Sequence, residues 1–399
     1  MSLQSVDLLN PDTYLDGVPH NRFELLRREA PVFWHPEPDG GPGFWCLTKY
    51  EDVRHVSREA TMFSSRHGGQ ITDLAAGDPR GSPDLLVNMD PPIHTLYRAL
   101  IGQSFTPTSI ARMEGFIQGE VTGLLDELVR RGSFEFMEDF CAKIPMAVIL
   151  KLVGVPAGDQ EQLRAWIIQI LARDDPEFAS SDAEVAATTG RFMEYAHALA
   201  AERRCQPRDD LLSRLMAAEV DGKKLSYAEF GMFFILLLAA GSHTTFLALG
   251  NAAFDLMAHA EQRSLLKANP ELIPAAVEEL LRFSPPLTHF RRTATCDVRI
   301  RGQNIRAGQK VVLWYASANR DEEVFESPHT FDAQRVRRDQ LAFGYGPHFC
   351  LGNALARLTL RVALAQYLDQ LSTLRLAAPA ERLRSATFNG FKRMPVCVD

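Results

Sequence analysis

The chain has 399 residues, of which 46% are hydrophobic and 23% charged, and its net charge is -7 at pH 7. These values are ordinary for a globular protein, and the mild acidity argues against a general nucleic-acid binder. The six cysteines are scattered without a close pair, which argues against a disulfide framework or zinc site and favours a reducing cytoplasm. No linker, repeat or low-complexity tract divides the chain, so we expect a single domain over residues 1–399.

Helical periodicity dominates the chain. Apolar residues recur at steps of three and four over seven segments, which predicts helices there. In chain order these segments are 21–29, 107–131, 144–153, 160–172, 183–204, 227–258 and 270–283.

Strand-like alternation is confined to three places. The segments 32–34 and 43–47 predict an early hairpin, 296–312 predicts another strand pair, and 394–398 predicts a last strand. We therefore expect a mainly α fold with a small β region. The β-rich parts are expected at about 31–48, 296–313 and 383–398.

The N-terminus lacks a basic start followed by an apolar run, so no signal peptide is predicted. The apolar run 233–240 has eight residues, too few to cross a bilayer, and indicates the core of a buried helix. We expect no membrane anchor and a cytoplasmic location.

One cysteine, Cys350, lies in a glycine-rich run from Phe343 to Gly352, and a helical-looking segment follows at 353–371. The thiolate is the metal-binding form of cysteine, and a helix N-terminus favours an anion. Gly346 and Gly352 would let the backbone pass close to a flat cofactor, and Phe343 supplies an aromatic face beside the sulfur. These features suit a haem iron held by a cysteine thiolate.

The run resembles the haem-binding signature of the cytochrome P450 family, Phe-x-x-Gly-x-Arg/His-x-Cys-x-Gly. The matching positions are Phe343, Gly346, His348, Cys350 and Gly352. A lone cysteine would more often be a buried structural residue, but five matches at fixed spacing favour the haem site. The resemblance covers nearly the whole chain. It implies a long central helix crossing the haem, a haem b cofactor with Cys350 as the metal ligand, and a monooxygenase activity.

The family resemblance also gives a structural meaning to Glu279, Arg282 and Arg335. Alone, an acid and a base three residues apart form an ordinary solvated pair. The pair resembles the family's Glu-x-x-Arg, and Arg335 stands where its partner arginine belongs. The resemblance implies that this trio holds the cysteine loop and has no catalytic role.

Cationic side chains should converge on the two haem propionates. His94 and Arg98 are four residues apart, hence on one face of the helix that Pro91 and Pro92 introduce. A lone pair of this kind is more often an ordinary surface or core feature. The resemblance matches both residues to propionate ligands, and matches Arg292 and His348 to two further contacts.

The oxygen-activating segment is expected where the apolar helix turns small and polar. Ala240 and Gly241 leave room for dioxygen, and Thr244 resembles the threonine that helps deliver protons. The alternative is a helix-packing contact with hydroxyls bonded back to the preceding turn. His243 stands where the family usually has an acid, although the sterol 14α-demethylase branch also has histidine there. We hypothesise that His243 relays protons, since imidazole titrates near neutrality, and a structural role is the alternative.

The resemblance places substrate contacts at mostly apolar side chains, which suits a hydrophobic molecule. They are Leu85, Val87, Ile168, Leu171, Leu287, Phe290 and Phe388. Terpenoids, steroids or branched lipids are favoured. Tailoring of a polyketide, peptide or carrier-bound natural product is the alternative, and an apolar stripe is also ordinary core.

A second cofactor signature is missing from the sequence, so the resemblance implies electrons from a ferredoxin and its reductase. An acidic partner would be steered to arginines on the cysteine side. These arginines are Arg98, Arg112, Arg335, Arg337, Arg338 and Arg357. A peroxide-using or nitric-oxide-reducing variant would keep Cys350 but alter the oxygen-activating helix, which Thr244 argues against. The small residues of that helix also argue against a haem sensor.

Overall fold

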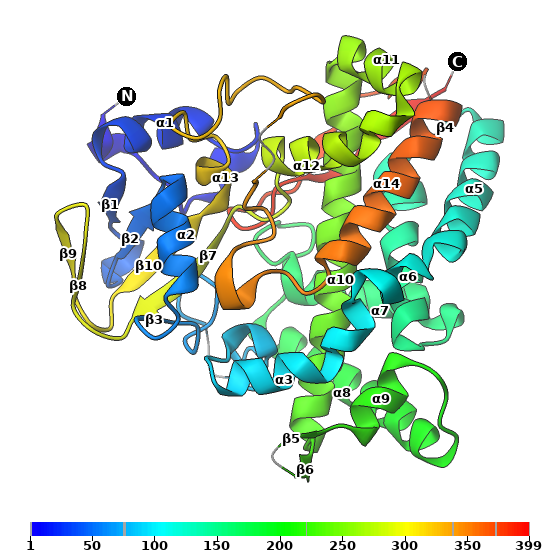
Figure 1. Ribbon diagram of the computed structural model, residues 1–399, viewed down its shortest axis with the longest axis horizontal. Helices are drawn as coiled ribbons and strands as arrows, with labels where there is room; N and C mark the ends of the chain where they lie inside the picture. Colours follow the sequence, from blue (N-terminus) through cyan, green and yellow to red (C-terminus); the bar gives the residue numbers. More distant parts are fainter. Residues whose placement is uncertain (1, 75–76, 221, 337–338, 372, 399) are drawn as a thin grey trace.

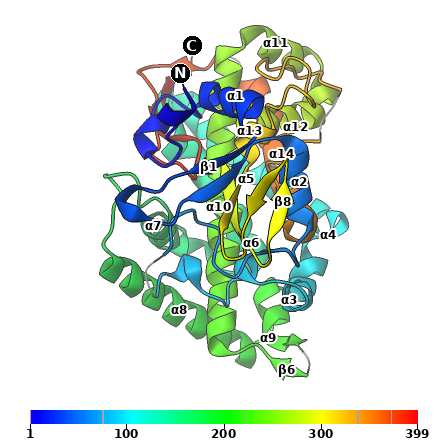
Figure 2. The same cartoon turned by 90° about the vertical axis from the view of Figure 1, so that its left-hand side faces the viewer.

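The computed structural model describes residues 2–74, 77–220, 222–336, 339–371 and 373–398. Helices make up one side of the molecule and the main β-sheet lies on the other (Figure 1). The long helix α10 (Tyr227–Ala258) runs through the helical side, and Figure 2 shows it passing behind the sheet. This is the expected mainly α fold with a small β region.

The helices follow the predicted segments with two kinds of difference. The longer ones are α1 (His20–Glu29), α2 (Tyr50–Arg58), α3 (Ile93–Gly102), α5 (Glu114–Arg131), α6 (Lys143–Val153), α7 (Gln160–Leu171), α8 (Asp182–Cys205), α9 (Leu211–Ala217), α11 (Ala260–Ala268), α12 (Ile273–Phe283) and α14 (Asn353–Gln370). The segment 107–131, predicted as one helix, is two, because α4 (Pro107–Ala111) ends in a tighter turn in which Met113 N donates to Ile110 O at 2.9 Å. Helices α2, α9 and α11 and the short α13 (Tyr315–Ala318) were not predicted.

Helix α10 has the predicted bounds. Its start is fixed by Ser226, whose hydroxyl accepts from Glu229 N at 3.2 Å while Ser226 N donates to Glu229 Oε2 at 2.7 Å. By length and composition this helix could cross a membrane, which corrects the view that no apolar stretch is long enough. However, 67% of its most apolar window is buried inside the protein, as in the core helix of a globular fold.

The main sheet has five strands in the order β1-β2-β10-β7-β3. They are β1 (Val32–His35), β2 (Phe44–Leu47), β3 (Phe63–Ser64), β7 (His289–Ala294) and β10 (Lys310–Trp314). The expected hairpin of β1 and β2 is present, and β10 lies parallel to β2 and antiparallel to β7. Strand β7 was not predicted, because five of its six residues are buried and no polar–apolar alternation results.

The segment 296–312 holds more than the predicted strand pair. Strands β8 (Val298–Ile300) and β9 (Gln303–Ile305) form a hairpin, and β10 leaves it to join the main sheet. The last predicted strand is β14 (Pro395–Cys397), which pairs with β11 (Arg375–Leu376) and β4 (Ser133–Glu135). Two short hairpins remain, β12 (Glu381–Arg382) with β13 (Phe391–Arg393) and β5 (Glu219–Val220) with β6 (Lys223–Lys224).

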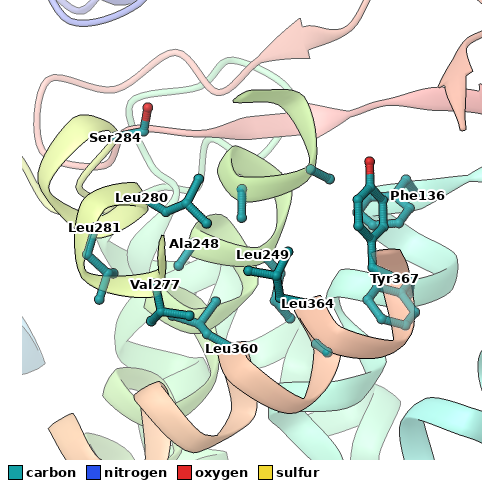
Figure 3. A pocket seen from close by; sticks show the side chains of 14 residues that line it. Phe136, Ala248, Leu249, Val277, Leu280, Leu281, Ser284, Leu360, Leu364 and Tyr367 are labelled. Atoms are coloured by element: carbon teal, nitrogen blue, oxygen red, sulfur yellow. The ribbon is translucent and has the colours of Figure 1, made fainter. Parts of the chain in front are cut away.

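An apolar cavity lies between α10, α12 and α14 (Figure 3). Leu249, Leu280 and Leu364 line it from the three helices, and the labelled polar side chains are Ser284 and Tyr367. Cys350 and the residues expected to touch a substrate are not among its lining. The cavity is therefore a packing feature of the helical core, separate from the candidate site.

Candidate functional site

The cysteine loop is a compact turn that delivers Cys350 to the start of α14. Gly344 and Gly346 have φ angles of +70° and +73°, which glycine adopts without strain. Cys350 N donates to Phe343 O at 2.9 Å, and Phe349 N donates to Gly346 O at 3.0 Å. The loop thus closes on itself, with Gly352 as the residue that precedes α14.

Gly346 has a steric role that was not expected, beside its predicted approach to a cofactor. A β-carbon there would lie 2.5 Å from the carbonyl oxygen of Ser57 in α2, so glycine lets the loop pack on that helix. Arg54 of α2 strengthens the same contact, since its Nη2 donates to Tyr345 Oη at 2.9 Å. A β-carbon at Gly352 would meet nothing within 4 Å. The close approach at Gly346 is therefore to protein backbone.

The sulfur of Cys350 is surrounded by groups that stabilise an anion. Burial raises the pKa of the thiol, while a hydrogen bond from the Gly352 backbone N–H and the charges of Arg98 and Arg357 lower it. Burial is the largest of these effects, so the pKa of the thiol is raised overall, while one N–H donor and two guanidinium groups partly offset it and would stabilise the metal-binding thiolate. This donor set fits a cysteine-held metal.

Four basic side chains from three distant segments converge beside this loop. They are His94 and Arg98 of α3, Arg292 of β7 and His348 of the loop itself. The rings of His94 and His348 are 4.1 Å apart between centroids, and Arg98 Nη2 donates to Phe349 O at 2.6 Å. The cluster brings two guanidinium groups and two imidazole rings together inside the fold.

Burial and mutual repulsion shift the titration of these groups. Burial first, then the charges of Arg98 and Arg292, lowers the pKa of His94 to about 4. Burial, then Arg292, His94 and Arg98, lowers the pKa of His348 to about 2. His94 Nδ1 is buried without a hydrogen-bond partner among the described residues. A ligand with two carboxylates would relieve this repulsion and supply the missing acceptors, so the cluster fits the propionates of a haem.

The side chains of residues 240–244, the small and polar segment of α10, lie on two different faces of the helix. Ala240 is exposed and Thr244, one turn later, is partly buried, so both lie on an open face. A β-carbon at Gly241 would lie 2.7 Å from Ile149 Cδ1, so Gly241 serves the packing of α10 on α6. Of the two small residues expected to make room for dioxygen, only Ala240 is exposed.

The hydroxyls of this segment bond back to the helix, as the alternative interpretation held. Thr244 Oγ1 donates to Ala240 O at 3.0 Å, and Ser242 Oγ donates to Leu238 O at 2.7 Å. The Thr244 hydroxyl keeps its lone pairs as acceptors in this arrangement, and it lies on the open face.

His243 lies on a different face from Thr244, because consecutive helical residues point about 100° apart. It is buried in a small cavity between α6, α7 and α10, whose lining includes Arg164 and Ser242. The ring of Phe388 meets it edge-on at 4.8 Å, and its Nε2 has no partner among the described residues. Burial, then the charge of Arg164, lowers the pKa of His243 to about 4, so the imidazole is neutral at pH 7.

The residues expected to contact a substrate fall into three groups. Leu171, Leu287 and Phe388 join Ile168 in one apolar cluster between the end of α7 and α10, and Leu287 and Phe388 form a β-bridge. Leu85 and Val87 belong to the main core, and Phe290 packs on the sheet.

Glu279, Arg282 and Arg335 form the expected buried trio. Arg282 donates to both carboxylate oxygens of Glu279 at 2.7 Å, and Arg335 Nε donates to both at 3.0 Å. Because Arg335 is only 9% exposed and held in this pair, its expected place on a docking surface is wrong.

Of the other arginines expected on that surface, Arg337 and Arg338 lie outside the described residues. Arg112 is exposed, whereas Arg98 and Arg357 are partly buried. Two polar contacts of the site were not predicted. Ser65 Oγ lies 3.2 Å from His348 Nε2, and Arg164 faces His243; no sequence pattern links either residue to its partner.

Comparisons with known proteins agree with this geometry. The family model for Cytochrome P450 matches residues 162–379. Steroid C26-monooxygenase of Mycobacterium tuberculosis is 35% identical over 98% of this chain and 92% of its own length. Linalool 8-monooxygenase of Pseudomonas putida is 34% identical over 99% of both chains. The crystal structure of a Mycobacterium marinum cytochrome P450 in complex with pseudoionone superimposes with a TM-score of 0.93 at 34% identity, covering 98% of each chain. The chain thus belongs to the cytochrome P450 family and is a monooxygenase with a haem-iron cofactor.

Proposed function

We propose that Cys350 binds the iron of haem b and that His94, Arg98, Arg292 and His348 hold its propionates. The observation that carries this assignment is the convergence of four basic groups, two buried and two partly buried, beside the cysteine loop. Phe343, Gly346 and Gly352 shape that loop, and Ala240 and Gly241 belong to the helix that faces the cofactor. The coverage of the relatives supports one domain over residues 1–399.

The bound haem supplies the oxidising chemistry, through which one oxygen atom from O2 enters a substrate. The part of the protein is to manage protons and exclude water. Thr244 lies on the open face of α10 and would turn its hydroxyl from Ala240 O toward the reacting oxygen. Because burial lowers the pKa of His243 to about 4, the relay that we propose for it would have to take up a proton at one ring nitrogen while it releases one from the other. An alanine at residue 243 that kept native turnover and coupling would contradict the relay.

A hydrophobic substrate fits the cluster of Ile168, Leu171, Leu287 and Phe388, which offers few polar groups. We favour a terpenoid, steroid or branched lipid, because the similar proteins are named for a steroid and for linalool, and one binds pseudoionone. Leu85, Val87 and Phe290 would complete the pocket.

Electrons are proposed to come from a ferredoxin and its reductase in the cytoplasm. The exposed Arg112, with the partly buried Arg98 and Arg357, would attract an acidic partner to the cysteine side. Loss of reduction rate with rising salt would support such docking, since salt screens exposed charges.

The test is the spectrum of the purified protein reconstituted with haem b. The ferrous carbonyl form should show a thiolate ligand, and Cys350→Ser should lose it. Cys205→Ser, at an exposed cysteine, is the matched control and should keep it. Steroids, terpenoids and fatty acids are then screened for a change of spin state in the visible spectrum. A nitrogen-ligated spectrum, or an unchanged one in Cys350→Ser, would contradict the proposed function.

A further inference from the structure

An ion pair beside the cysteine loop is not part of the expected site. Glu278 of α12 precedes Glu279 but contacts Arg357 of α14. Arg357 Nε donates to Glu278 Oε1 at 2.5 Å, and Arg357 Nη2 donates to Glu278 Oε2 at 3.0 Å. Paired parallel hydrogen bonds of this kind fix both the distance and the orientation of a guanidinium. Adjacent residues of α12 therefore bind arginines from two different segments, one before the cysteine loop and one after it.

Arg357 also contacts one side chain in each of the segments that flank Cys350. Its guanidinium carbon lies 4.4 Å from the centroid of the Phe343 ring, and Phe343 O accepts from Cys350 N at 2.9 Å. On the other side, its Nη1 donates to Asn353 Oδ1 at 2.7 Å, and Asn353 Nδ2 donates to Cys350 O at 2.7 Å. The position of Arg357 is thus linked to both peptide groups of the cysteine.

Glu278 is held from the start of the loop as well. Gln340 Nε2 donates to Glu278 Oε2 at 3.1 Å, and Gln340 Oε1 accepts from Ala342 N at 2.6 Å. The side chains of Glu278 and Arg357 are only 17% and 32% exposed, so water screens their charges less than at an open surface. The positive charge of Arg357 acts on the sulfur of Cys350, and the carboxylate of Glu278 partly cancels it.

We propose that Glu278 and Arg357 are positioning residues that set, as a balanced charge pair, how strongly the Cys350 thiolate donates electrons to the haem iron. The inference rests on the proposed haem-thiolate site. Charges and hydrogen bonds around a ligating sulfur set the reduction potential of the metal. Removing Glu278 leaves an uncancelled cation near the sulfur, which weakens donation and raises the potential. Removing Arg357 leaves an uncancelled anion, which lowers it.

The experiment measures the midpoint potential of the purified haem protein by chemical reductive titration without a redox partner. Glu278→Gln should raise the potential and Arg357→Gln should lower it. The double variant should return close to the parental value, because no net charge is left. Arg130→Gln removes an exposed cation of α5 that bonds the carbonyl of Asp126, and should leave the potential unchanged.

A purely structural role predicts a different pattern. Both single variants would then shift the potential in the same direction or lose the thiolate-ligated carbonyl spectrum, and the double variant would not recover. Either result overturns the inference. If the glutamine variants lose haem, Glu278→Asp and Arg357→Lys carry the test, since each keeps its charge. Midpoint potentials close to the parental value in these two charge-conserving variants support the inference, and loss of the thiolate-ligated spectrum overturns it. Parental protein without a thiolate-ligated haem would refute the proposed function itself.

Discussion

The protein buries arginines in two neighbouring regions, with opposite means of balancing their charge. Arg282 and Arg335 share the carboxylate of Glu279, whose side chain is 1% exposed, so the chain supplies its own counter-ion. Arg292 is 4% exposed and donates to the carbonyl of Arg291, and no ion pair is described for it in the part of the chain that the structure covers. A buried charge without a partner is costly. In the first region the protein itself balances the buried charges, whereas the second region is suited to an anionic ligand.

The largest effect is expected at the self-balanced trio. Glu279→Gln leaves two buried guanidinium groups without a carboxylate, so the free energy of unfolding should fall by about 3–5 kcal/mol. Urea unfolding of the haem-free protein measures this change. Glu261→Gln, at an exposed position of α11, is the control and should lower it by less than about 0.5 kcal/mol. A similarly small effect at Glu279 would remove the distinction between the two regions.

A substitution in the basic cluster around Arg292 should affect the stability of the haem-free protein in the opposite way. Arg292→Met removes a poorly balanced buried charge, so the haem-free protein should keep or gain stability. Haem affinity should fall by about 10- to 100-fold through the loss of a charged hydrogen bond. Haem titration combined with urea unfolding separates the two readouts.

The adjacent residue provides a matched control for this variant. Arg291 pairs with Asp73 at 2.5 Å, so Arg291→Met should destabilise the haem-free protein instead. If Arg292→Met lowered the stability of the haem-free protein as much as Arg291→Met, the charge of Arg292 would be balanced by the protein and not by a ligand.

The buried His243 predicts a pH dependence of stability. Its pKa is about 4 in the folded protein against about 6.5 when unfolded, so the unfolded state binds the proton first as the pH falls. The stability contribution is complete above about pH 6.5, is lost as the pH falls toward 4, and is reduced by about 2 kcal/mol at pH 5. Unfolding of the haem-free protein at pH 7 and pH 5 should show this slope, and His243→Gln should reduce the loss of stability by about 2 kcal/mol while His94 and His348 maintain the remainder.

Ser242→Ala is the control for this measurement, because it alters the same cavity without removing a titratable group. Its slope between pH 7 and pH 5 should match that of the parent. An unchanged slope in His243→Gln would show that His243 is not buried in its neutral form.

The smallest expected effect concerns the two glycines of the loop. Gly346→Ala should destabilise the haem-free protein by at least about 1 kcal/mol, because φ is positive and the β-carbon would meet Ser57 O. Gly352→Ala has open space around it and should change stability little. If Gly346→Ala affected only haem binding, the glycine would serve the cofactor and not the packing on α2.

The parts of the site that spacing and periodicity alone could predict have their neighbours in space close by in sequence, whereas the basic cluster and the Glu279 trio were predicted only from the family resemblance. The cysteine loop and α10 fall within single segments, so spacing and periodicity were sufficient to find them. The split of segment 107–131 and the face on which Gly241 packs depend on contacts with distant helices. The contact of Gly346 with α2 could not be predicted for the same reason, because Ser57 lies almost 300 residues away in the chain.

The sequence alone determined the cysteine motif, the helical class and the central helix, because each is a local pattern repeated at fixed spacing. The family resemblance implied that α3, β7 and the cysteine loop bring four basic groups together, whereas only the tertiary structure decided that Arg335 is buried while Arg112 is exposed. It also decided that Glu278 and Glu279, adjacent in the chain, bind different arginines. The physical reason is that charge balance depends on which groups share a buried volume, and that volume is enclosed by segments far apart in the sequence.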